Sequence, residues 1–355
     1  MFKRKSKYSL LSVIVLAVFA LALVIGSSQV VFAAEKYVIG IPALSTISDW
    51  NLFCVKGMED MAEELGMEVI VTDANMDYSK QNQDAETMIR RHVDALLLPG
   101  GGAPAFRSTV EAAAKANIPI ISVEVLLEGP TVKTEVASNQ FLVGFYPTNY
   151  LLDRINRTGK VAVFYQPGFT SIERRYKAFE MVKNEYTGIE VVAEHPFGNA
   201  DFVNYAMAAT ESILKAHPDL KGIWCCWDGP GTGAAKAVRA AGRRDIVVTG
   251  IDGNRMALEL LRDPDACLAA TLCQDGYEQG RVGVRLALQV FQGKEIPRYI
   301  TLPNLLITKE NVSEIPVGMV WTKASEFGWD EDVIAVWEEV NGKSLPPLSE
   351  QHWLY

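Results

Sequence analysis

The chain contains few of the residues and spacings on which metal, cofactor and disulfide chemistry depend. It has only four histidines in 355 residues, scattered along the chain without the close spacing of a metal site. Its five cysteines cannot all pair with one another, and Cys225 and Cys226 are neighbours in an apolar run, where successive side chains face opposite sides of a strand. We therefore expect no metal site and no cofactor, and we expect the cysteines to be buried thiols that behave as small hydrophobic residues.

Phosphate and calcium loops are also missing, although two segments imitate them. After Gly229 and Gly231, Gly233 is followed by alanine rather than by the lysine and hydroxyl residue of a phosphate loop, and alanine also takes the third glycine position of the dinucleotide pattern. Residues 73–84 place oxygen-bearing side chains at four calcium-loop positions but lack the central glycine. That pattern favours a strand-to-helix turn with a capping residue. The glycines at 100–102 would let a loop bend or approach a ligand closely.

The amino terminus is typical of a secretory signal. Four basic residues come within the first seven, an uncharged run extends from Ser9 to Gly26, and Val31 and Ala33 stand at −3 and −1 of a small-residue site. We expect cleavage after Ala33 and export to the periplasm or the outer face of the cell envelope. An uncleaved membrane anchor is the alternative, because the apolar run is long.

The chain without residues 1–33 is acidic. It carries 30 Lys and Arg against 43 Asp and Glu, a net charge of −13. Such a surface repels nucleic acid and anionic lipid, so we expect no nucleic-acid partner. About 320 residues exceed one ordinary domain, which predicts two lobes.

Short apolar runs alternate with amphipathic segments in two successive rounds. The runs are 37–41, 68–72, 95–99 and 118–122 in the first round, and 160–165, 189–194, 221–226, 245–250 and 267–272 in the second. Helical patterns between them include 49–65, 79–91 and 104–116. This rhythm predicts an α/β fold of two Rossmann-like lobes with parallel, doubly wound sheets. Ligands of such sheets bind at the carboxyl ends of strands, which a cleft between the lobes would collect from both sides.

Residues at the predicted strand ends suit a polar, uncharged ligand. Indole rings stack on the apolar face of a sugar, while carboxylates, amides and a guanidinium bind its hydroxyl groups. The candidate ligand-binding residues are Trp50, Asn51, Glu124, Asn139, Arg175, Trp227, Asp228, Asp252 and Gln274. A secreted hydrolase with Asp228 and Asp252 as paired carboxylates is the alternative from another class, although the chain has no G-x-S-x-G motif.

The chain resembles the ribose-binding-like group of periplasmic sugar-binding proteins, the type I solute-binding proteins of ATP-driven importers. The resemblance runs from Tyr37 to Thr308. It is carried by WNLFCVKGMEDMAEELG, DALLLPGGG, ANIPIISVE, VASNQFLVG, LKAHPDLKGIWCCWDGPGTGAAKAVRAAG, VVTGIDG and LAATLCQD.

This resemblance implies two lobes joined by three hinge strands near 137–139, 273–275 and 301–304. The lobes would comprise 34–137 with 274–302, and 138–273 with 303–355, the last including a carboxyl-terminal extension. It also implies that Trp50 stacks on the sugar, and that Glu124, Arg175, Asp252 and Gln274 contact it, with Trp227 before the second-lobe aspartate.

Two departures from the family pattern bear on the ligand. Val125 stands where an arginine is common, and Trp227 stands where ribose binders carry an amide. A pentose other than ribose, a hexose, a deoxysugar or a polyol is therefore expected.

The function implied is delivery of a monosaccharide or polyol to the ABC permease of the cytoplasmic membrane, by a monomer whose hinge closes around the ligand. A sensor subunit that presents the ligand to a chemoreceptor or histidine kinase is the alternative.

Overall fold

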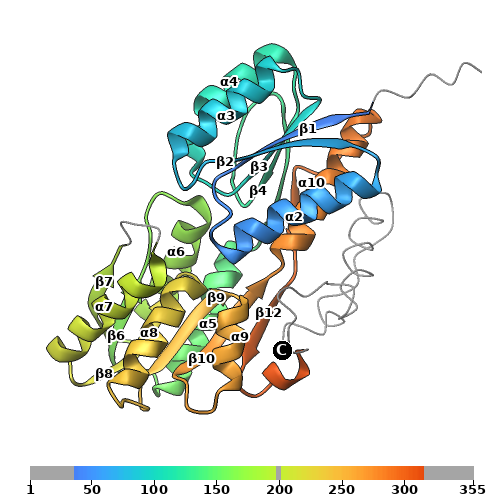
Figure 1. Ribbon diagram of the computed structural model, residues 1–355. Helices are drawn as coiled ribbons and strands as arrows, with labels where there is room; N and C mark the ends of the chain where they lie inside the picture. Colours follow the sequence, from blue (N-terminus) through green and yellow to red (C-terminus); the bar gives the residue numbers. More distant parts are fainter. Residues whose placement is uncertain (1–35, 197–200, 316–355) are drawn as a thin grey trace, which may run out of the picture. The chain divides into compact units, whose positions relative to one another are not determined.

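The computed structural model describes residues 36–196 and 201–315, which form two six-stranded sheets (Figure 1). The predicted secretory signal and residues 316–355, which hold most of the predicted carboxyl-terminal extension, lie outside these ranges. Within them, no helix combines the length and apolar character needed to cross a membrane.

The first sheet is parallel throughout, in the order β11-β5-β4-β3-β1-β2. Its strands are β1 (Val38–Ala43), β2 (Glu68–Asp73), β3 (Ala95–Pro99), β4 (Ile120–Val123), β5 (Val132–Ser138) and β11 (Tyr299–Leu302). Every residue of β3 is buried, as expected for a central parallel strand covered on both faces. This burial explains why the strand reads as an unbroken apolar run.

Helices cover both faces of the first sheet. One face packs against α2 (Asp49–Glu64) and α10 (Gly276–Phe291), and the other packs against α3 (Tyr78–Arg90), the 3-10 turn η1 (Ala103–Phe106) and α4 (Arg107–Ala116). Helices α2 and α10 lie so close that a Cβ atom at Gly57 would collide with the backbone of Tyr277, and one at Gly280 with the backbone of Cys54. Glycine is therefore required at both crossing points.

The second sheet has the order β12-β10-β9-β8-β6-β7 and is parallel except for β12, which pairs antiparallel with β10. Its strands are β6 (Gly159–Phe164), β7 (Ile189–His195), β8 (Leu220–Cys225), β9 (Val247–Asp252), β10 (Leu268–Gln274) and β12 (Asn304–Thr308). Helices α5 (Gln140–Arg154) and α6 (Thr170–Asn184) cover one face, while α7 (Phe202–Ala216), α8 (Asp228–Ala240) and α9 (Arg255–Arg262) cover the other, with η2 (Val312–Glu314) following β12.

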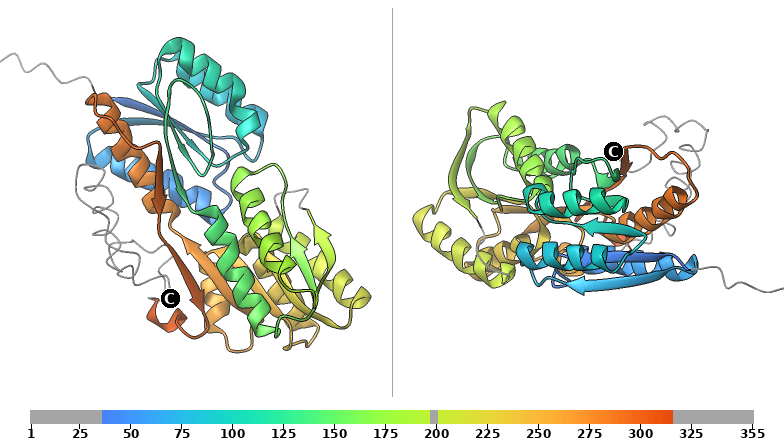
Figure 2. Two further views of the ribbon diagram at one scale, coloured as in Figure 1. Left: turned by 180° about the vertical axis from the view of Figure 1, so that it is seen from behind. Right: turned by 90° about the horizontal axis from the view of Figure 1, so that it is seen from above.

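The chain passes from one sheet to the other three times. The first passage follows β5, the second follows β10, and the third joins β11 to β12, as the view from behind shows (Figure 2). The predicted class of two Rossmann-like lobes joined by three hinge strands is confirmed. Sequence periodicity missed β5, β11 and β12 as strands, and the residue limits of the two lobes stay a prediction.

Two local expectations are also confirmed. All five cysteines are buried thiols that form no disulfide with one another, and they contribute apolar surface to the two cores. In the segment that imitates a calcium loop, Asp77 caps α3 by accepting hydrogen bonds from the backbone N–H groups of Ser79 and Lys80. This carboxylate therefore begins a helix.

Candidate functional site

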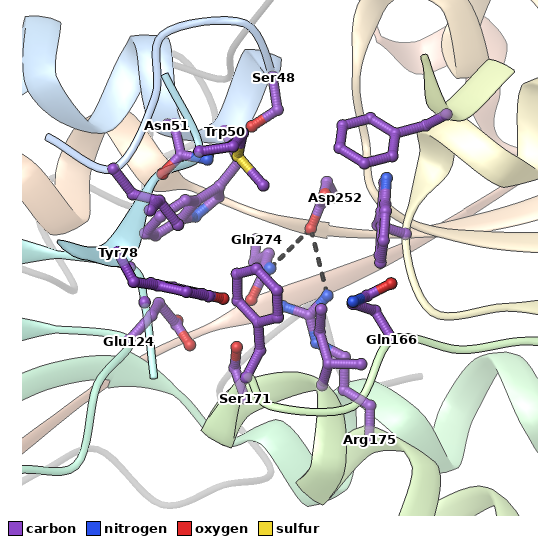
Figure 3. Close-up of a pocket in the computed structure, with 18 residues that line it drawn as sticks. Ser48, Trp50, Asn51, Tyr78, Glu124, Gln166, Ser171, Arg175, Asp252 and Gln274 are labelled. Atoms are coloured by element: carbon purple, nitrogen blue, oxygen red, sulfur yellow. Dashed lines mark hydrogen bonds and ion pairs between the residues drawn. The ribbon is translucent and has the colours of Figure 1, made fainter. Parts of the chain in front are cut away.

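A cavity of about 270 Å³ is lined by strand ends and helix starts that belong to both sheets. Figure 3 shows Trp50, Asn51 and Tyr78 on one side, Gln166 and Arg175 on the other, and Asp252 and Gln274 between them. Seven of the nine predicted residues line this cavity: Trp50, Asn51, Glu124, Arg175, Trp227, Asp252 and Gln274. The structure does not bring the other two, Asn139 and Asp228, into the lining.

Trp50 is positioned by the turn between β1 and α2. Its ring is 8% exposed, and its indole N–H donates to the side-chain oxygen of Gln279, with a distance of 3.1 Å between Nε1 and Oε1. A Cβ atom at Gly276 would lie 2.9 Å from the indole, so glycine at the start of α10 leaves space for the ring. Next to it, the side-chain amide of Asn51 donates to Ser48 Oγ at 2.7 Å. The indole is therefore held as a fixed wall.

Glu124 follows β4 and is held by three hydrogen-bond donors. Its backbone has a φ of 60°, in the left-handed region that few non-glycine residues adopt. Oε1 accepts from the Ser138 N–H at 2.8 Å and from Gln279 Nε2 at 2.7 Å, and Oε2 accepts from Gln140 Nε2. Burial raises the pKa of Glu124 to about 7, against Arg175 and the hydrogen bonds, which lower it. Most of its acceptor capacity is used inside the protein.

Asp252 ends β9 and faces the cavity with one oxygen engaged. Its φ is 115°, and its Oδ1 accepts from Gln274 Nε2 at 2.7 Å and lies 3.6 Å from Arg175 Nη1 (Figure 3). Burial raises the pKa of Asp252 to about 6, while Arg175 lowers it. No hydrogen bond to Oδ2 is found in the described part of the chain, which leaves this oxygen to accept from a bound hydroxyl group.

Arg175 is the only cation among the described residues that line the cavity. It lies in α6 and is 5% exposed. Its Nε donates to Gln140 Oε1 at 2.6 Å, and its Nη1 donates to the carbonyl oxygen of Cys226 at 2.8 Å. These two bonds fix the plane of the guanidinium, so Nη2 is held at a defined position for a ligand oxygen.

Aromatic rings form walls on both sides. Trp227, the residue before α8, makes an edge contact with Phe202, with ring centroids 5.1 Å apart. Tyr78, at the first position of α3, contacts Phe169 of the other lobe, with ring centroids 5.6 Å apart. The Tyr78 hydroxyl is buried without a hydrogen-bond partner in the described residues, and burial raises its pKa.

Sequence reasoning missed Tyr78, Phe169 and Phe202. Tyr78 could have been found, because it opens the helix after β2 just as Trp50 opens the helix after β1. Gln166, Ser171 and the apolar lining residues Leu44, Met76 and Ile172 carry no comparable signal in the sequence.

The structure gives Asn139 and Asp228 structural roles instead of ligand contacts. Asn139 caps α5, its side-chain oxygen accepting from the N–H groups of Phe141 and Leu142. The fully buried Asp228 carboxylate accepts from the Thr271 hydroxyl at 2.7 Å and from the Asn254 N–H at 2.8 Å. Both side chains satisfy nearby donors, and neither lines the cavity.

The glycine-rich segment after Trp227 is the first part of a packed helix. A Cβ atom at Gly233 would collide with the carbonyl oxygen of Val203, whereas one at Gly231 would meet only ordinary contacts, the nearest 3.5 Å away. Gly100 and Gly101 line the cavity with positive φ angles of 63° and 108°. Gly233 therefore serves helix packing, whereas Gly100 and Gly101 serve the loop bend that the sequence predicted.

The cavity thus combines five aromatic rings with two carboxylates and one guanidinium. The rings belong to Trp50, Tyr78, Phe169, Phe202 and Trp227. Such a site can stack on apolar C–H faces and hydrogen-bond hydroxyl groups at the edges. In the described ranges, no group of three or more His, Cys, Asp or Glu side chains could hold a metal ion.

Residues 39–295 match the periplasmic binding protein domain family. The chain belongs to this family. Its ribose-binding-like group is the one that the sequence motifs predicted, and the relatives confirm it. Val125, the first of the two departures from the family pattern, is fully buried in the apolar core of the first sheet.

Three relatives illustrate the similarity. The ribose import binding protein of Bacillus subtilis is 29% identical over 278 residues, covering 78% of this chain and 88% of the relative. A xylitol-binding protein of Mycolicibacterium smegmatis is 26% identical, covering 79% and 81%. The crystal structure of an ABC transporter solute-binding protein from Agrobacterium vitis with bound allitol is similar with a TM-score of 0.76 and 27% identity, covering 80% of this chain and 99% of that one.

Proposed function

We propose that this protein binds a monosaccharide or polyol in the cavity between its two lobes and delivers it to an ABC importer. The observation that carries the proposal is the composition of the cavity, in which indole rings from both lobes flank an arginine–aspartate pair. The names of the relatives, which refer to ribose, xylitol and allitol, support a ligand of this class.

The charge of the lining supports an uncharged ligand. Arg175 is already paired with Asp252 and bonded to Gln140, and Glu124 adds a second acid, which is buried. A phosphate would bring two negative charges to this site, where the described lining residues offer no further cation to match them, at a cost of several kcal/mol. A neutral polyol needs only the donors and acceptors that are present.

The same geometry supports binding without chemical change. The hydrolase alternative needs two carboxylates facing one bond, and it named Asp228 and Asp252. Asp228 faces Thr271 and Asn254 instead of the cavity. The relatives described above are binding proteins by name.

We further propose that the protein is exported and acts as a monomer. Its lobes close about the three hinge strands when the ligand bridges Trp50 and Arg175, which belong to different lobes. The closed form is the one that the permease recognises. The proposed contacts are the seven predicted lining residues together with Tyr78 and Phe169.

A thermal-shift screen tests the proposal. The chain without residues 1–33 is heated with ribose, xylitol, allitol, myo-inositol or ribose 5-phosphate, and the supernatant is then examined by mass spectrometry. At a ligand concentration of 100 Kd, binding adds about 2.7 kcal/mol to the free energy of unfolding. We expect stabilisation by at least one neutral compound, recovered unchanged. Stabilisation by the phosphate alone, or recovery of a product, would contradict the proposal.

A further inference from the structure

Gln140 occupies the point where the binding-site side chains of the two lobes meet. It is the first residue of α5, directly after the first passage between the sheets, and it is 2% exposed. Its side-chain oxygen accepts from Arg175 Nε at 2.6 Å. Its side-chain nitrogen donates to Gln274 Oε1 at 3.1 Å and to the Glu124 carboxylate. Gln140 itself does not line the cavity.

These bonds join two sets of ligand-facing groups. On one side, Glu124 is bonded to Gln279, which holds the indole N–H of Trp50. On the other side, Gln274 is bonded to Asp252. The amide of Gln140 connects both sets through one side chain, because an amide can donate and accept at the same time. A shift of the side chains on one side of the cavity can therefore displace those on the other side through these hydrogen bonds.

The bond to Arg175 has a geometric consequence. A guanidinium is planar, so fixing Nε and Nη1 also fixes the direction of Nη2. Without Gln140, the bond to the Cys226 carbonyl and the ion pair with Asp252 would be the remaining contacts from the described residues that hold this plane. A small misplacement of a binding group is sufficient to lower affinity markedly.

We propose that Gln140 is a positioning residue of the binding site, which orients Arg175 toward the ligand by tying it to Glu124 and Gln274 across the hinge. The inference rests on the proposed function for the identity of its ligand. It concerns a side chain that does not touch that ligand.

The first test compares Gln140→Leu with Gln289→Leu by calorimetry, using the neutral compound that most stabilises the wild type. Gln289 is also a buried glutamine, but it lies in α10 outside the cavity lining. We expect the Kd to rise about tenfold or more for Gln140→Leu and to stay unchanged for Gln289→Leu. An unchanged Kd for Gln140→Leu would overturn the proposal.

The second test is a cycle with Arg175→Lys, which removes the guanidinium fork. If Gln140 acts through Arg175, the double variant should bind within about threefold of Arg175→Lys alone, because the contact that Gln140 positions is already lost. Additive losses would show that Gln140 contributes independently of Arg175, which contradicts the proposed role.

The third test needs no ligand and stands even if no polyol binds. Exchange of the Arg175 Nε–H with water is followed by NMR in the ligand-free protein, with the signal assigned by its loss in Arg175→Lys. We expect slow exchange in the wild type and in Gln289→Leu, and fast exchange in Gln140→Leu. Equally slow exchange in Gln140→Leu would overturn the positioning role, whereas a failed ligand screen would overturn only the proposed function.

Discussion

The partly buried Asp252 and the fully buried Asp228 should respond differently to replacement by alanine. The Asp252 carboxylate lines the cavity and lies beside Arg175, and the described residues donate no hydrogen bond to its Oδ2. The Asp228 carboxylate is outside the lining and satisfies the Thr271 hydroxyl and the Asn254 N–H. Asp252→Ala should therefore weaken binding, and Asp228→Ala should mainly destabilise the fold.

The magnitudes follow from the bonds that each change removes. A hydrogen bond between a ligand hydroxyl and the Asp252 carboxylate contributes about 1.5–3 kcal/mol, which corresponds to a rise in Kd of roughly 10- to 150-fold. Asp228→Ala removes the acceptor of two donors, the Thr271 hydroxyl and the Asn254 N–H, at about 1–3 kcal/mol each in the free energy of unfolding. Its Kd should stay within about threefold of the wild type, because no ligand contact is lost.

Calorimetry at 15 °C, where both variants are expected to be folded, measures the two Kd values, and thermal unfolding without ligand measures the two stabilities. Asp252→Ala also leaves Arg175 without its ion-pair partner, so some loss of stability is expected there as well. A tenfold weaker Kd for Asp228→Ala, with no change for Asp252→Ala, would refute the placement of these two carboxylates.

Three further predictions follow from the site. Trp227→Ala should raise the Kd about tenfold through loss of ring stacking, whereas Gly231→Ala should change the Kd little, because a Cβ atom at Gly231 has space. A large effect on the Kd only at Gly231, measured by calorimetry, would favour a phosphate loop. In the folded state the pKa values of Glu124 and Asp252 are about 7 and about 6, above their ordinary values of 4.5 and 3.8. The free energy of unfolding of the ligand-free protein should therefore fall as pH rises from about 4 to 7, and Glu124→Gln should flatten this fall. A denaturant series in which stability rises across that window would contradict the prediction. Scattering curves should show compaction at saturating ligand, and curves that do not change would leave hinge closure unsupported.

The sequence predicted the strand ends well because their physical signal is local. Buried parallel strands read as apolar runs, and the residues that follow them lie at one edge of the sheet. This reasoning placed Trp50, Glu124, Arg175, Asp252 and Gln274 correctly at the cavity. It missed β5, β11 and β12 as strands, because these hinge segments take their pairing from the other strands of each sheet.

The side-chain directions within each loop could not be predicted in the same way. Trp227 and Asp228 are neighbours, yet only the indole lines the cavity, because the carboxylate is drawn to the Asn254 N–H and the Thr271 hydroxyl of other loops. Asn139 and Gln140 differ likewise: the first caps its own helix and the second reaches Arg175. These side-chain directions depend on hydrogen-bonding partners, several of which are distant in the sequence.

The structure of the protein crystallised with the neutral compound selected by the thermal-shift screen tests the central claim most directly. We expect the compound, chemically unchanged, between Trp50 and Trp227, with hydroxyl groups bonded to Arg175 Nη2 and Asp252 Oδ2. A compound bound outside this cavity, or held by the backbone of the glycine-rich segment at residues 229–233, would contradict the account.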